Sequence, residues 1–115
     1  MKTASAKAKG RKLQQWVRDL LLKLSGLPSS DIRSTGMGQT GSDIQLAQSA
    51  LALWPLSIEC KNLARVAALR WLEQAEAYST TDTVPIVVVK ENHGKPVVLV
   101  DAEYFFKLVY NNNKE

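Results

Sequence analysis

The segment from residue 40 to 61 constrains the fold of this chain most. It places Asp43 in one short apolar run, and it places Glu59 and Lys61 on either side of Cys60 in a second run. Alternate side chains of a β-strand share a face, so Glu59 and Lys61 would point to one side while Cys60 points to the other. If Asp43 lies on an adjacent strand, two carboxylates and one ammonium group meet on one face of a sheet.

These three side chains suit metal-assisted chemistry on a phosphate. Mg²⁺ prefers oxygen ligands and usually takes one or two protein carboxylates together with water and substrate phosphate. A neighbouring lysine can stabilise the negative charge that develops during the reaction. For an isolated Glu-x-Lys, an ordinary surface salt bridge is the alternative, because short motifs match by chance. Here the motif follows Gly-Ser-Asp-Ile and lies among apolar residues, which favours a metal site.

Residues 41–44 (GSDI) and 58–61 (IECK) resemble the PD-(D/E)xK nuclease signature. The form is similar to that of Holliday-junction resolvases and the small phage nucleases related to them. The resemblance implies hydrolysis of DNA phosphodiester bonds with Mg²⁺, for which Mn²⁺ can substitute. It implies that Asp43, Glu59 and the Cys60 carbonyl bind the metal. It also implies that Lys61 acts on the nucleophile. The proline that names the signature is absent, and Ser42 stands in its place.

Length and composition limit the other possibilities. The chain has 115 residues, one Cys, one His and a net charge of +4. This length suits one domain with one core. A single Cys excludes an internal disulfide and a Cys-based zinc cluster, so we expect a reducing compartment. No apolar run is long enough for a membrane span. We therefore expect a cytoplasmic protein, in the host cytoplasm if a phage encodes it.

Basic residues gather at the start of the chain. Before Ser25 there are seven Lys or Arg residues and one acidic residue, Asp19. Such a segment can contact phosphates, and Lys9, Arg11 and Lys12 are the candidates. A solubilising tail is the equally acceptable alternative.

The apolar periodicity predicts a first helix over residues 10–25, with an inward stripe from Leu13 through Trp16 to Leu24. In the resolvases this helix carries a metal-site Glu, and Gln14 occupies the matching position. A short strand follows at residues 30–35, where Arg33 and Thr35 loosely resemble a phosphate-contact element of that family. A glycine-spaced loop, residues 36–41, leads to the acidic segment.

The remaining elements alternate between strands and helices. We expect strands at 43–47, 56–61, 84–89 and 96–100, and helices at 50–54 (capped by Ser49), 64–78 and 102–110 (capped by Asp101). The strand at 84–89 is apolar throughout and should be buried on both faces. Trp54 should pack in the core, and His93 should lie in a turn. On the helix at 64–78, Arg65 is a DNA-binding candidate, and the resemblance implies that Gln74 returns to the metal site.

These elements predict an α/β fold with a restriction-endonuclease-like αβββαβ core, in which helices flank a central mixed β-sheet. We expect a basic flexible arm at 1–9, one nuclease domain at 10–110 and a frayed tail at 111–115. The expected function is a structure-selective endonuclease similar to Holliday-junction resolvases, acting on branched or nicked DNA as a homodimer. Two alternatives stay open. One is a nicking or flap nuclease resembling the VRR-NUC family, and the other is a non-catalytic DNA-binding module on a nuclease fold.

Overall fold

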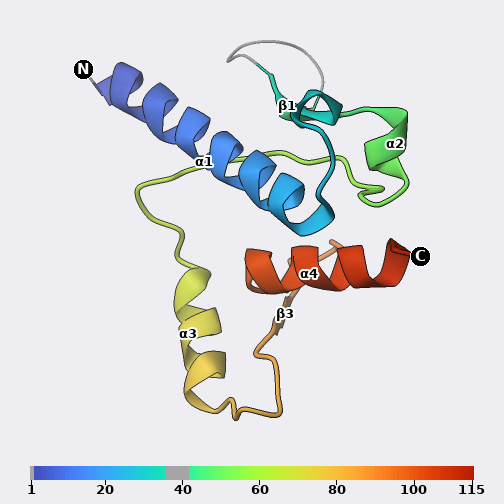
Figure 1. Ribbon diagram of the computed structural model, residues 1–115. Coiled ribbons are helices and arrows are strands. Elements are labelled where there is room, and N and C mark those ends of the chain that lie inside the picture. The colour runs from blue at the N-terminus through green and yellow to red at the C-terminus, as the bar shows by residue number, and fades with distance from the viewer. Residues whose placement is uncertain (1, 36–41) are drawn as a thin grey trace. The chain divides into compact units, whose positions relative to one another are not determined.

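The computed structural model describes residues 2–35 and 42–115, with side chains from residue 7 onward. Within these residues the chain is a mixed α/β protein with four α-helices and two small antiparallel sheets (Figure 1). The elements are α1 (Lys2–Ser25), η1 (Ser29–Asp31), β1 (Ile32–Ser34), β2 (Ile44–Leu46), α2 (Gln48–Leu51), α3 (Leu69–Ala77), β3 (Val87–Val89), β4 (Val97–Leu99) and α4 (Ala102–Asn113).

The described chain divides into two compact units. The first unit is Met1–Leu63 together with Phe106–Glu115, and the second unit is Ala64–Phe105. Each unit contains one of the two-stranded sheets. The single central mixed sheet that we expected is therefore not what the described residues form. Each strand is only three residues long and makes a ladder with one partner, so it has little edge with which to recruit a further strand.

Helix α1 begins at Lys2, so residues 2–9 belong to the helix and do not form a separate arm as predicted. Alanine and lysine favour helix in this segment and extend the helix beyond the amphipathic part. The predicted C-terminal end is confirmed. Gly26 has a φ of 71° and donates its N–H to the Leu22 carbonyl at 2.8 Å, as expected for a glycine that ends a helix.

The inward face of α1 confirms the predicted stripe except at Trp16, since Val17 and Leu21 are buried and Leu13, Leu20 and Leu24 pack on the core. Gln14, Val17 and Leu21 are the buried side chains, and Gln14 is only 5% exposed. Trp16, which we expected in the core, is 46% exposed. The helix is apolar over a wide arc, so its pattern alone does not decide whether Trp16 faces the core.

Strands β1 and β2 pair in antiparallel register, with Ile32 opposite Leu46 and Ser34 opposite Ile44. Ile32 and Ile44 are buried beneath α1, which packs on β1. Arg18 connects the helix to this sheet. Its Nε donates to the Ile32 carbonyl at 2.7 Å.

Trp54 is at the centre of the core of the first unit, and its predicted packing role is confirmed. The indole is fully buried and lies edge-on to Phe106, with ring centroids 6.2 Å apart. It stacks on Tyr110 at 5.8 Å. Ser49 does not cap the adjacent helix α2 as predicted. It lies inside α2 and donates its hydroxyl to Asp31 Oδ2 at 2.7 Å.

The second unit consists of α3 and the β3–β4 hairpin. The helix is shorter than predicted, since it begins at Leu69. His93 lies in the predicted turn with a φ of 65°, and Gly94 donates its N–H to the Glu91 carbonyl at 3.0 Å. Val88 is exposed, so the segment at 84–89 is not buried on both faces as we expected. A two-stranded ribbon leaves at least one of its faces without a covering layer.

The last helix, α4, begins at its predicted cap. The Asp101 carboxylate accepts the N–H of Tyr104 at 2.8 Å. The helix extends through Asn113, and Lys114 donates its N–H to the Tyr110 carbonyl, so most of the predicted frayed tail continues the helix. The packing of Phe106 and Tyr110 on Trp54 holds this end of the chain.

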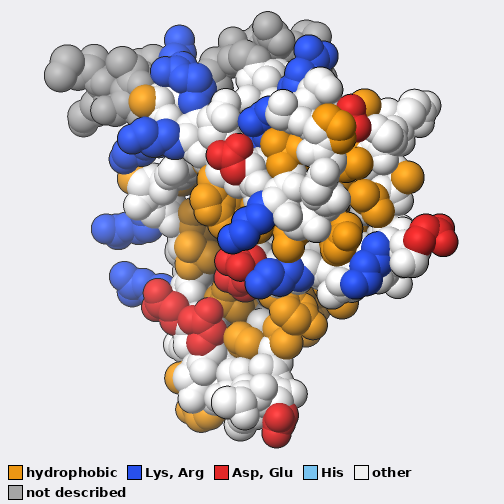
Figure 2. Space-filling view, in the orientation of Figure 1, with side chains coloured by type: hydrophobic (Ala, Val, Ile, Leu, Met, Phe, Trp, Pro, Cys, Tyr) orange, Lys and Arg blue, Asp and Glu red, His pale blue; other side chains and the backbone are white. Residues whose placement is uncertain are grey.

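The surface carries large apolar side chains among the Lys and Arg residues, as Figure 2 shows for one face. In the described part of the chain, no helix has both the length and the apolar character needed to cross a bilayer.

Candidate functional site

Asp43 lies beside residues 57–60, although the two segments are well separated in sequence. The Cys60 N–H donates to Asp43 Oδ2 at 2.6 Å, and the Asp43 N–H donates to the Ile58 carbonyl at 3.1 Å. The hydroxyls of Ser42 and Ser57 are 2.9 Å apart. These bonds place the Asp43 carboxylate next to the backbone that carries Glu59 and Lys61.

The predicted strand over residues 56–61 is not formed. The chain there lies beside Asp43 but forms no regular strand in the described structure. The Asp43 carboxylate occupies the Cys60 N–H, which a neighbouring strand would otherwise bind in a ladder. Glu59 and Lys61 are exposed, and Asp43 and Cys60 are half-buried.

Thr35 supports the backbone of Asp43. Its N–H and its hydroxyl both donate to the Asp43 carbonyl, at 2.9 Å and 3.3 Å, and its side chain is buried. A buried and hydrogen-bonded hydroxyl has no free approach to a phosphate. We therefore assign Thr35 to positioning Asp43 and not to the phosphate contact that we expected.

The oxygen atoms of this region are of the kind that a hard cation such as Mg²⁺ binds. The Asp43 carboxylate bonds to the Cys60 N–H through Oδ2, which leaves Oδ1 as a potential ligand. Glu59 and Cys60, which follow Ile58 in the segment beside Asp43, carry a carboxylate and a backbone carbonyl that a cation could bind. No cluster of three or more His, Cys, Asp or Glu side chains occurs within the described ranges. A site with two carboxylates, completed by water and substrate phosphate, therefore fits Mg²⁺ better than a metal held only by protein side chains.

The pKa of the Cys60 thiol depends on the charged groups around it. Burial raises the pKa of Cys60 above its ordinary value of 9.0, and the negative charges of Asp43 and Glu59 raise this pKa further. Both effects disfavour the thiolate. Cys60 is therefore a neutral thiol at neutral pH, and its side chain is a poor nucleophile.

We expect Cys60 to react slowly with iodoacetamide in metal-free buffer. Because the folded-state pKa is raised, the thiolate should form only as the pH rises above 9.0, later than in an unfolded chain. The measurement is the alkylation rate against pH, with urea-unfolded protein as the control. Asp43→Asn should move the midpoint to lower pH, because one of the repelling charges is gone. A midpoint below that of the unfolded chain would contradict this electrostatic description.

The predicted phosphate contacts of the first unit are exposed. Lys9, Arg11 and Lys12 lie on the surface of α1, and Arg33 lies on the outer face of β1 opposite Gln45. All four side chains can reach a ligand in solvent. The glycine-spaced loop at 36–41 lies outside the described residues.

Arg65 and Gln74 belong to the second unit, and both are exposed. Arg65 precedes α3 in a segment without helix, while Gln74 lies on α3. Their participation in the site stays a prediction.

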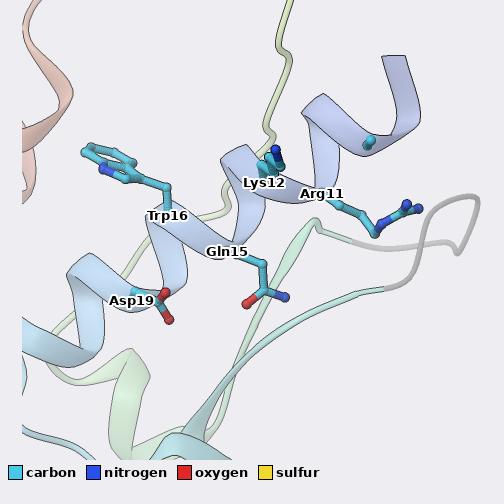
Figure 3. Close-up of a pocket in the computed structure, with 6 residues that line it drawn as sticks. Arg11, Lys12, Gln15, Trp16 and Asp19 are labelled. Carbon is cyan, nitrogen blue, oxygen red and sulfur yellow. The ribbon is translucent and has the colours of Figure 1, made fainter. Parts of the chain in front are cut away.

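A separate cavity of about 590 Å³ lies along α1. The described residues that line it are Ala8, Arg11, Lys12, Gln15, Trp16 and Asp19. Figure 3 shows five of these side chains on the same stretch of helix. Sequence reasoning assigned Arg11 and Lys12 to phosphate binding but missed Gln15 and Trp16. The spacing of the six positions, which is that of one helical stripe, is the signal that could have identified them.

No known protein family matches this chain, and no curated protein or solved structure is detectably similar to it.

Proposed function

We propose that this chain is a divalent-metal-dependent DNA endonuclease on a PD-(D/E)xK-type core. The observation that carries the proposal is the 2.6 Å bond from the Cys60 N–H to Asp43 Oδ2. This bond brings together the two parts of the sequence that resemble the nuclease signature. The donor is the backbone N–H between Glu59 and Lys61, so the bond places the Asp43 carboxylate next to this motif.

The order of elements gives further support. Helix α1, the β1–β2 hairpin, the extended segment at 56–61 and helix α3 follow one another as they do in an αβββαβ core. The described structure departs from this core in two ways, since residues 56–61 form no strand and β3 pairs with β4 in a separate sheet.

Asp43, Glu59 and the Cys60 carbonyl would hold Mg²⁺, with Mn²⁺ as a substitute. The bound cation would supply Lewis acidity and neutralise charge on the phosphate. The Cys60 N–H holds the Asp43 carboxylate in place, and Thr35 fixes the backbone of the same residue. The site is thus preorganised on the protein side, as efficient electrostatic catalysis requires.

Lys61 acts on the reacting phosphate. In hydrolysis, a water oxygen forms a bond to phosphorus, the bond to one ester oxygen breaks, and a proton from water ends on the leaving oxygen. The Lys61 ammonium can donate hydrogen bonds to the attacking oxygen or to a phosphoryl oxygen. Its positive charge stabilises the negative charge that develops there.

The substrate in this proposal is branched or nicked DNA. The exposed Lys9, Arg11, Lys12 and Arg33 supply phosphate contacts that carry no base sequence information. So small a chain has few elements for reading a groove, which favours recognition by shape. Cutting both strands of a junction would require a homodimer with two sites, and Arg65 and Gln74 would add to DNA binding and to catalysis.

We expect cleavage in Mg²⁺ or Mn²⁺ and none in EDTA. In Ca²⁺ the protein should bind DNA with little turnover, because Ca²⁺ positions its ligands loosely. The test incubates the protein with junction, flap, nicked and linear duplex DNA and separates the products by gel electrophoresis. A preparation of Asp43→Asn purified in parallel controls for contaminating nuclease. Equal cleavage by both preparations, or full cleavage in EDTA, would refute the assignment.

A further inference from the structure

The outward stripe of α1 combines cations with an exposed aromatic ring. Arg11 and Lys12 come first, Gln15 and Trp16 follow one turn later, and Asp19 ends the stripe (Figure 3). At 1.5 Å per residue, the stripe from Arg11 to Asp19 is about 12 Å long. None of the residues at the Asp43 site lines this cavity.

Trp16 lies on the outer face of α1. Its side chain is 46% exposed, while Gln14, Val17 and Leu21 form the buried face of the same helix. Burying the indole would stabilise the fold, since large aromatic side chains contribute much of the free energy of packing. Trp16 lines the same open cavity as Lys12 and Arg11, and in Figure 3 its ring points away from the Arg11 side chain.

The neighbouring side chains are held in place. Gln15 donates from Nε2 to the Ser34 hydroxyl at 3.0 Å, which fixes its amide against the β1–β2 hairpin. Asp19 pairs with Arg18 at 3.4 Å, and Arg18 is itself bonded to the carbonyls of Ile32 and Ser29. One end of the cavity is thus cationic and the other carries a carboxylate.

We propose that this cavity binds an unpaired nucleotide of a single strand, with the base stacked on Trp16 and two neighbouring phosphates of the strand on Lys12 and Arg11. Base stacking on aromatic rings within a basic groove is the general mode of single-strand binding. Asp19 would repel a phosphate at the far end and so give the bound strand a direction. A base inside an intact duplex is already stacked, so the cavity selects flaps, forks and gaps over continuous duplex.

This proposal rests on the proposed nuclease function in one respect: it assumes that the ligand is DNA. Its test is a binding measurement in EDTA, which does not depend on cleavage. The probe is fluorescein-labelled oligo(dT) followed by anisotropy, and the comparison is the wild type with Trp16→Leu, Trp16→Phe and Trp71→Leu. Trp71 is 49% exposed and lines a separate cavity of the second unit with Lys90 and Lys95, so Trp71→Leu tests whether any exposed indole near lysines binds oligo(dT).

Trp16→Leu should weaken oligo(dT) binding roughly 5- to 150-fold, the range measured when one stacking ring is removed. Trp16→Phe should recover much of the affinity, since it keeps an aromatic face. Trp71→Leu should bind like the wild type. Thermal unfolding of each variant establishes that the fold is retained. In the Trp71→Leu background, oligo(dT) should also quench the emission of Trp16, because Trp54 is buried.

Salt dependence separates stacking from charge. The double variant Arg11→Gln with Lys12→Gln should lower the slope of log K against log salt by about 1.4, at about 0.7 per phosphate contact on single strands. Trp16→Leu should leave this slope unchanged while it lowers the affinity.

Two results would overturn the proposal. One is unchanged oligo(dT) affinity in folded Trp16→Leu. The other is a concentration-dependent dimer that dissociates in Trp16→Leu while oligo(dT) binding persists, which would make Trp16 a protein–protein contact. If Trp16-dependent binding is found but no DNA is cut in any metal, the nuclease proposal fails and this one stands. If the protein cuts DNA but folded Trp16→Leu binds oligo(dT) with wild-type affinity, the single-strand proposal fails and the nuclease proposal stands.

Discussion

Asp43→Asn should abolish Mg²⁺ binding and cleavage without unfolding the protein. The substitution removes one of two charged ligands but keeps an oxygen that can accept the Cys60 N–H. We expect calorimetry to detect no Mg²⁺ binding and the cleavage rate to fall by at least about 10²–10³-fold. Thermal stability should hold, because the Asn side chain keeps an acceptor for the Cys60 N–H.

Asp31→Asn is the matched control for this experiment. Asp31 lies in the same unit, and its carboxylate accepts the Ser49 hydroxyl, so the variant makes the same chemical change outside the proposed site. It should bind Mg²⁺ and cut DNA like the wild type. Asp43→Ala tests the hydrogen bond separately. It leaves the Cys60 N–H without this acceptor and should cost about 1–3 kcal/mol of unfolding free energy. Unchanged Mg²⁺ binding by Asp43→Asn would exclude Asp43 as a metal ligand.

Lys61→Ala should slow cleavage by about 10²–10³-fold or more while Mg²⁺ binding persists. The side chain is exposed, so its truncation should leave the melting temperature unchanged. Both carboxylates remain to hold the cation, and the basic face of α1 remains to hold DNA. The measurements are single-turnover cleavage rates, calorimetric Mg²⁺ titration and DNA binding in Ca²⁺.

Two variants sharpen the interpretation of Lys61. Lys61→Arg keeps the charge but presents it in a planar fork, so it should recover only part of the rate. Lys95→Ala removes an exposed charge in the turn between β3 and β4 and should leave the rate unchanged. If Lys61→Ala cleaves DNA at the wild-type rate, the Lys61 ammonium has no role in the reaction. The proposed catalytic role of residues 58–61 is then wrong.

Local signals in the sequence determined where several elements begin and end. Gly26 ends α1 because it adopts positive φ without a steric cost. Asp101 begins α4 because its carboxylate can accept an orphan N–H of the first turn. The turn around His93 and Gly94 was identified in the same way. Each of these signals acts over a few residues, so no tertiary contact is needed to interpret it.

The juxtaposition of Asp43 with Glu59 and Cys60 was inferred from alternation and resemblance, but its form depends on the tertiary structure. Sequence suggested a third strand at 56–61. In the folded chain the Asp43 side chain, and not a strand backbone, binds the Cys60 N–H. Side chain and backbone compete for the same donor, and the outcome depends on how closely the segments approach.

Only the tertiary structure decided on which side of α1 Trp16 lies. The periodicity correctly predicted that Val17 and Leu21 face the core, but it also placed Trp16 there, because the apolar residues of this helix cover a wide arc. Contacts with the β1–β2 hairpin fix the rotation of α1 about its axis. Arg18 donates to the Ile32 carbonyl, and Gln15 donates to the Ser34 hydroxyl. These contacts turn Gln14 inward and Trp16 outward, and so place an aromatic ring beside the cations of the helix. The sequence determined which side chains α1 carries, and the packing of its polar neighbours determined which of them meet solvent.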